Sequence, residues 1–172
     1  MRYGTPYKGS KNAICDRLAE AVPWKGISNF YDLFAGGCAM THRMLLGGRY
    51  AHCHANDMDG QGLRLFMNAA SGKYRDEKRW ISREDFDHGA FYNWCCSQSE
   101  LVLVSEYQMP EDRFEPVLSL EKTSLLSQKG ADKKVTERLY VPRHQLETYR
   151  RLMHEQNKPR YIEMNLFGQQ DY

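Results

Sequence analysis

The sequence has few of the features that assign a protein to a class at first sight. No run approaches the roughly 18 consecutive apolar residues that a membrane-spanning helix needs. The N-terminus, MRYGTPYKGSK, is polar and contains no apolar block of the signal-peptide kind. A formal net charge of +2 is too small to indicate nucleic-acid binding by itself. We therefore expect a cytoplasmic protein with no membrane partner.

The five cysteines lack the spacing of a disulfide framework or of a zinc site. The chain has no Cys-x-x-Cys pair, and Cys95 and Cys96 are adjacent, which suits neither a structural disulfide nor tetrahedral zinc. We expect reduced, mostly buried thiols and no bound metal. The remaining cysteines are Cys15, Cys38 and Cys53.

The chain does contain an alternation of strand and helix patterns over a length that suits one domain. Strand and helix patterns follow each other in turn near the N-terminus, which is typical of a parallel sheet covered by helices. Apolar spacing and Gly or Pro stops there predict helices at 11–23, 39–48 and 60–71 and strands at 27–34 and 49–57. Further along, the same signals predict helices at 88–99 and 143–158, strands at 100–107 and 137–141, and an irregular tail from 159.

The strongest local signal is the stretch SNFYDLFAGGCAMTHRML, residues 28–45. Its apolar run reaches Asp32, turns through Gly36 and Gly37, and continues as a predicted helix. Such glycines let the backbone approach a ligand, and about twenty residues on Asp57 ends the next strand, where an acid accepts hydrogen bonds from ribose hydroxyls. The pattern is not Gly-x-Gly-x-x-Gly, so it predicts an adenosyl-type rather than a nicotinamide cofactor. Alternatively, the glycines only permit a tight turn and Asp57 caps a helix.

The N-terminal segment PYKGSK places an aromatic residue, a glycine and a lysine directly before a predicted helix. Ser10 can cap that helix while Lys11 reaches an anion. An ordinary capped helix start explains the same residues without a ligand.

Taken in order, these motifs resemble the Dam-like (class alpha) DNA adenine-specific N(6)-methyltransferases. The family begins with an aromatic-x-Gly-Gly/Ser-Lys segment, followed by an Asp-x-Phe-x-Gly-Gly-Gly turn and an Asn-Asp pair. The matching residues are Tyr7, Gly9, Ser10 and Lys11, then Asp32, Phe34, Gly36 and Gly37, with Cys38 in place of the third glycine, then Asn56 and Asp57. GKYRDEKRWISREDF, FDHGAFYNWC, LVLVSEYQMPED and KKVTERLYV also resemble family segments, so the resemblance spans residues 3–142.

The resemblance implies an α/β, Rossmann-like, S-adenosylmethionine-dependent methyltransferase fold with a mostly parallel sheet and helices on both faces. The methyltransferase domain would cover residues 1–142, with a C-terminal helix and irregular tail at 143–172. S-adenosylmethionine is the implied cofactor and double-stranded DNA the implied substrate of a monomer without metal, acting alone or beside a restriction enzyme. The implied cofactor contacts are Tyr7, Gly9, Lys11, Asp32, Phe34, Gly36, Gly37 and Asp57.

The sequence also suggests where DNA would be contacted. Cations gather in two polar stretches, and the segments Lys73–Arg83 and Lys129–Lys134 are the candidates for phosphate contact. Solvated loops explain both stretches equally well. Trp80 is a candidate for stacking on a base, although a half-buried core position is the simpler interpretation.

One essential family motif is absent. The family holds the flipped adenine with Asp-Pro-Pro-Tyr, but the six prolines of this chain are never adjacent. Most of the DNA-recognition region is absent too. Two segments that stand well apart in the family are adjacent here and meet at Phe86–Asp87, a point that we call the sequence join. We therefore name no catalytic residue.

In the fold that the resemblance implies, the missing motif belongs to a strand between those at 30–34 and 101–107. Its loss would leave buried backbone groups unpaired at about 1–3 kcal/mol each, against a total stability of about 5–15 kcal/mol. We therefore expect that the functional protein contains a segment that these 172 residues omit. The alternatives are a relative that binds S-adenosylmethionine or DNA without methylating, and a nucleotide-cofactor oxidoreductase or small-molecule methyltransferase.

Overall fold

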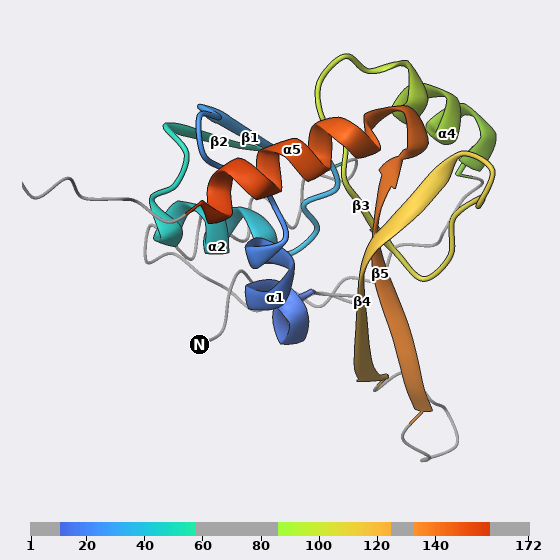
Figure 1. The fold of residues 1–172 in the computed structure, drawn as a ribbon. Helices are drawn as coiled ribbons and strands as arrows, with labels where there is room; N and C mark the ends of the chain where they lie inside the picture. The colour runs from blue at the N-terminus through green and yellow to red at the C-terminus, as the bar shows by residue number, and fades with distance from the viewer. Residues whose placement is uncertain (1–10, 58–85, 125–132, 159–172) are drawn as a thin grey trace, which may run out of the picture.

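The computed structural model describes residues 11–57, 86–124 and 133–158, which form two small sheets and the helices around them (Figure 1). One sheet has two parallel strands and the other has three antiparallel strands. No helix in the described part of the chain is both long enough and apolar enough to cross a membrane.

The N-terminal unit follows the predicted order of helix, strand, helix and strand. Its strands pair in parallel, from Asn29 opposite His52 to Asp32 opposite Ala55. The elements are η1 (Asn12–Ile14), α1 (Cys15–Glu20), β1 (Asn29–Asp32), α2 (Ala39–Gly47) and β2 (His52–Ala55). The four predictions in this unit are confirmed with shorter bounds, and the helix predicted at 60–71 lies outside the described residues.

The end of α2 shows why the glycine stop was a reliable signal. Gly48 has a φ of +58°, which an L-residue adopts only at a cost, and its N–H donates to the carbonyl oxygen of Leu45 at 3.2 Å. This is the glycine C-cap that commonly ends a helix.

The second sheet contains one strand that sequence reasoning missed. Its strands are β3 (Val104–Glu106), β4 (Phe114–Ser124) and β5 (Lys133–Pro142), in the order β3-β5-β4. The strand predicted at 100–107 is observed as the shorter β3, and the strand predicted at 137–141 is observed as the longer β5. No pattern indicated β4, because Pro116 lacks a backbone N–H and the register shifts between Pro116 and Leu118 to accommodate it.

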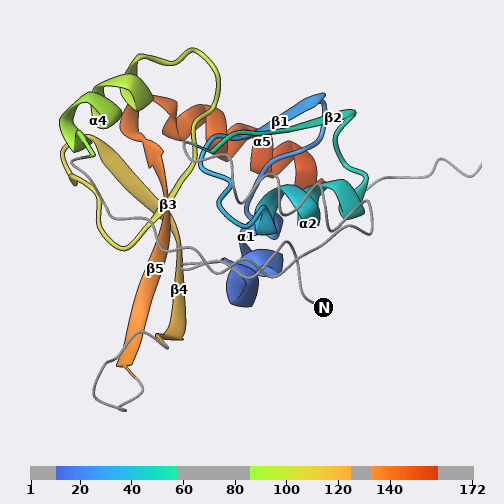
Figure 2. The same ribbon diagram turned by 180° about the vertical axis from the view of Figure 1, so that it is seen from behind.

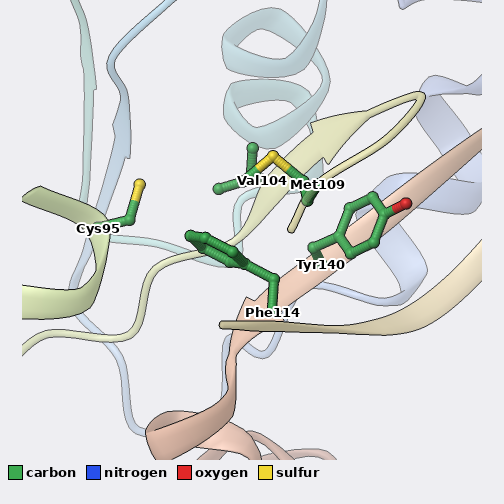
Figure 3. Packing of buried hydrophobic residues seen from close by; sticks show 5 residues of the cluster. All are labelled: Cys95, Val104, Met109, Phe114 and Tyr140. Atoms are coloured by element: carbon green, nitrogen blue, oxygen red, sulfur yellow. The ribbon is translucent and has the colours of Figure 1, made fainter. Parts of the chain in front are cut away.

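Helices cover both faces of this antiparallel sheet. On one face, α4 (His88–Ser97) contributes Cys95 to a core with Val104, Met109, Phe114 and Tyr140 (Figure 3). The opposite face packs against the N-terminal helices. The core there contains Ile14, Leu18, Leu120 and Leu139. Neighbouring residues of β5 thus enter different cores, as strand alternation requires.

The single, mostly parallel sheet implied by the resemblance is not what the described residues form. The chain is mixed α/β, but within the described ranges β1 pairs only with β2, and β3 pairs only with β5. Among the described residues no strand pairs with both β1 and β3, so backbone hydrogen bonds do not join the two sheets there.

The C-terminal helix bridges the two sheets (Figures 1 and 2). It continues from β5 through η2 (Arg143–Gln145) into α5 (Leu146–Asn157), confirming the helix predicted at 143–158. The Tyr149 hydroxyl donates to the carbonyl oxygen of Ala21 at 3.1 Å, and Gln156 accepts from the backbone N–H of Trp24 at 2.7 Å. The helix thereby contacts the α1–β1 connection, while the proposed boundary at residue 142 stays a prediction.

Candidate functional site

The turn between β1 and α2 is fastened to the end of β2. The Ala35 N–H donates to the carbonyl oxygen of Asn56 at 2.9 Å, and the Asn56 N–H donates to the carbonyl oxygen of Asp32 at 2.8 Å. Gly36 has a φ of +49° and Cys38 a φ of +59°. The left-handed conformation costs a non-glycine residue about 1–2 kcal/mol, so at Cys38 tertiary contacts overcome a local preference.

Asp57 adds a further hydrogen bond between the end of β2 and the turn. Its Oδ2 accepts a hydrogen bond from the Gly36 N–H at 2.8 Å, across 21 positions of sequence. The acid expected to bind ribose and the glycine expected to cradle the ligand are therefore in direct contact. The bond orients the carboxylate at the carboxyl end of β2, where open α/β sheets bind their ligands.

Asp32 is the second carboxylate of the turn. Its Oδ2 accepts from the Thr41 hydroxyl at 2.7 Å and from the Thr41 N–H at 3.2 Å. Burial raises the pKa of Asp32, the Thr41 bonds oppose the rise, and the charge of Asp57 adds to it. Burial, followed by the charges of Asp32 and Asp57, raises the pKa of the Cys38 thiol to about 11. The turn is therefore an acidic site suited to a ligand with positive charge and hydrogen-bond donors.

An aromatic pocket lies beside the turn. Its volume is about 430 Å³, and it opens where β1 and β2 end against the start of α4. The Phe34 side chain, 55% exposed, meets Phe86 and Phe91 edge-on, with ring centroids 6.0 and 5.5 Å apart. The lining residues are Leu33, Phe34, Asn56, Phe86, Asp87, Ala90, Phe91 and Trp94.

Sequence reasoning predicted only Phe34 of these aromatic residues. The signal for the others in the sequence is the aromatic cluster in FDHGAFYNW, whose residues from His88 belong to the helix predicted at 88–99. Asp87 is the N-cap of that helix, accepting from the Ala90 N–H at 2.8 Å, so the sequence join at Phe86–Asp87 forms one wall of the pocket.

Among the described residues, Lys11 contacts the antiparallel sheet rather than the glycine turn. Its ammonium forms an ion pair with Glu137 and donates to the carbonyl oxygen of Ser105 at 3.3 Å. The Ser105 hydroxyl donates to the same Glu137 carboxylate at 2.7 Å. Glu137 is fully buried, so removing one partner of the pair would cost about 3–5 kcal/mol. The sequence carried no signal for Glu137 or Ser105.

The structure thus brings together Asp32, Gly36, Gly37 and Asp57, with Phe34 at the adjoining pocket. Tyr7, Gly9 and Lys73–Arg83 lie outside the described residues, as does all but the last part of Lys129–Lys134, so those assignments stay predictions. Within residues 11–57, 86–124 and 133–158, no group of three or more His, Cys, Asp or Glu side chains could hold a metal ion.

Comparison with known families agrees with the N-terminal motifs. Residues 7–83 match the family model described as D12 class N6 adenine-specific DNA methyltransferase, and this match supports that family and its general activity. The matched region contains the glycine turn and Asp57 and ends just before the sequence join. No curated protein and no solved structure matches the chain.

Proposed function

We propose that the protein is an S-adenosylmethionine-dependent DNA methyltransferase that modifies the exocyclic amine of adenine in a duplex. The observation that carries the proposal is the contact between Gly36 and Asp57 at the carboxyl ends of β1 and β2, next to the buried Asp32. S-adenosylmethionine bears a sulfonium, an ammonium and two ribose hydroxyls. The two carboxylates offer the charge and the acceptors that these groups require.

The aromatic pocket supports a place for the target base. A base inside a duplex cannot be reached by the reacting groups, so it must be extruded. The rings of Phe34, Phe91 and Trp94 offer apolar surface for a planar purine, and stacking on one aromatic ring contributes about 1–3 kcal/mol per base. The pocket adjoins the glycine turn through Phe34, so base and cofactor would lie next to each other.

The residues of this chain act mainly by positioning. When bound, S-adenosylmethionine would supply an electrophilic methyl group for the adenine amine; the new N–C bond would form as the S–CH3 bond breaks, with S-adenosylhomocysteine as leaving group and the amine proton passing to solvent. Asp57, oriented by Gly36, would hold the ribose, and the turn would keep the backbone close to the ligand. No residue is assigned as acceptor for the amine proton, because Asp-Pro-Pro-Tyr is absent. That absence favours, as a second candidate, a relative that binds S-adenosylmethionine or DNA without methylating.

Calorimetric titration with S-adenosylmethionine and a radiolabel transfer assay on adenine-containing duplex test the proposal. We expect the wild-type chain to bind and Asp57→Asn to weaken binding about tenfold or more, because a charged acceptor becomes a neutral and weaker one. Asp112→Asn, the same change at an exposed acid remote from the turn, should bind like wild type.

Three outcomes separate the candidates. Binding followed by methyl transfer supports the enzyme, and N6-methyladenine duplex should then accept no label. Binding without transfer identifies the non-catalytic relative. If the wild-type chain binds no S-adenosylmethionine, both the proposed cofactor and the proposed methyltransferase activity are wrong.

A further inference from the structure

A buried ionic cluster joins the start of η1 to the centre of the antiparallel sheet. Glu137 lies on the middle strand β5 and is 0% exposed. Its Oε1 accepts from the Ser105 hydroxyl at 2.7 Å and pairs with the Lys11 ammonium, which also donates to the Ser105 carbonyl oxygen at 3.3 Å. Side chain and backbone of the neighbouring strand β3 therefore hold both members of the pair.

Stability alone is a poor explanation for this cluster. A buried ion pair is seldom more stabilising than well-packed apolar side chains of the same volume, because both charges must leave water. What the pair does provide is one fixed place for the Lys11 ammonium. The Lys11 side chain stays 28% exposed, and two of its three N–H donors have partners among the described residues. Among the described residues, one donor thus remains for a ligand.

The segment that carries Lys11 is also fastened toward the glycine turn. Ile14 packs in the core with Leu120 and Leu139 of the antiparallel sheet. On its other side, the Cys15 thiol donates at 3.3 Å to the carbonyl oxygen of Ala39, the first residue of α2 after the turn. The η1–α1 segment is therefore held between the antiparallel sheet and the helix that follows the proposed cofactor site.

We propose that Glu137, oriented by Ser105, is a positioning residue that holds the Lys11 ammonium for the carboxylate of S-adenosylmethionine. That carboxylate is the one anionic group of the cofactor. The inference rests on the proposed function and adds to it two residues from the antiparallel sheet, which lies beyond the family match at residues 7–83. Glu137 acts through Lys11 and touches no reacting atom.

The test compares two ligands on a set of variants. The ligands are S-adenosylmethionine and its decarboxylated analogue, titrated by calorimetry, with thermal unfolding measured separately without ligand. The variants are Glu137→Gln, Lys11→Met, the double variant, and Ser105→Ala. Glu115→Gln is the matched control, because it makes the same change in a surface ion pair, with Arg143 at 2.9 Å.

We expect Glu137→Gln and Lys11→Met each to lower affinity for S-adenosylmethionine about tenfold, and the double variant to be no weaker than either. Affinity for the decarboxylated analogue should hardly change, since it lacks the group that Lys11 would contact. Ser105→Ala should shift affinity in the same direction by less, and Glu115→Gln should bind like wild type. If Lys11→Met fails to fold because it leaves the buried Glu137 carboxylate unpaired, or if Glu137→Gln fails to fold, the double variant and Ser105→Ala still decide, because neither leaves an unpaired buried charge.

Two other results would overturn the inference, for different reasons. Variants that unfold earlier but keep the wild-type preference between the two ligands would assign the cluster a structural role only, and the proposed function would stand. A wild-type chain that binds neither ligand would contradict the proposed function itself, and the positioning role with it.

Discussion

At the scale of single residues, the buried carboxylate of Asp32 in the proposed ligand site lowers the stability of the fold when it is charged. Burial raises the pKa of this carboxyl above its ordinary value of 3.8, and the Thr41 hydrogen bonds offset only part of the effect. The folded state therefore binds a proton more tightly than the unfolded state. The resulting contribution to stability is fully present below the unfolded pKa and is lost as pH rises through the raised folded pKa.

We expect Asp32→Asn to remove this pH-dependent loss. The amide oxygen can still accept from Thr41, and it carries no charge that burial would penalise. The free energy of unfolding, measured with urea from about pH 4 to about pH 7, should fall with pH less in the variant than in wild type. Asp112→Asn, at an exposed acid, serves as control. A wild-type-to-variant difference that is the same at every pH would contradict the prediction.

At the scale of elements, one buried side chain decides where β3 begins. Gln145 of η2 is 5% exposed, and its Oε1 accepts from the Val102 N–H at 2.8 Å. Its Nε2 donates to the carbonyl oxygens of Gln98 and Glu100 at 2.9 and 2.8 Å. The backbone leading into β3 thus bonds to a side chain instead of a neighbouring strand. This is why the strand predicted from residue 100 starts only at Val104.

Replacing Gln145 by leucine should destabilise the fold strongly. Three partly buried hydrogen bonds to the backbone would be lost, each worth about 1 kcal/mol, so we expect the free energy of unfolding to drop by up to about 3 kcal/mol. Chemical denaturation measures the change, and Gln108→Leu, at an exposed glutamine, should alter it little. A loss below about 1 kcal/mol would mean that water or a local shift replaces these bonds.

At the scale of the whole molecule, the two sheets differ in how deeply their residues are buried. In the antiparallel sheet, Leu139, Tyr140 and Val141 of β5 are all buried. In the parallel pair, alternate residues are exposed, and Tyr31, 61% exposed, stacks on His54 with ring centroids 4.5 Å apart. A two-stranded sheet is marginal without further cover; among the described residues, α2 packs on both of its strands and α5 bonds to the connection before β1.

Hydrogen exchange should show directly that the parallel pair is less stable than the antiparallel sheet. We expect the amides of β5 to exchange slowest and those of β1 and β2 to exchange faster through local opening. Exchange followed by mass spectrometry on the intact chain measures both regions in one experiment. Equal protection of the two sheets would show instead that α5 couples them into one cooperative unit.

The sequence by itself determined the local features of this protein. The helices at α1, α2, α4 and α5, the glycine stop at Gly48 and the glycine turn were all predictable. Each depends on residues only a few positions apart, where periodicity, capping and turn conformation act directly. The position of Asp57 near the glycine turn also followed, because a repeated strand-turn-helix pattern places the ends of parallel strands together. The hydrogen bond between Asp57 and Gly36 was not predicted.

Only the tertiary structure decided the rest. Lys11 and Glu137 are 126 positions apart, and nothing in either segment indicates the other. The pocket forms because Phe34 and Phe91, which lie on opposite sides of the sequence join, come into ring contact. The strand β4 forms by pairing with β5 although it contains Pro116. Within the described residues the sheet division is likewise a matter of long-range pairing, since β1 pairs with β2 and β3 with β5. In each case the free energy comes from contacts between distant segments, which local propensity does not specify.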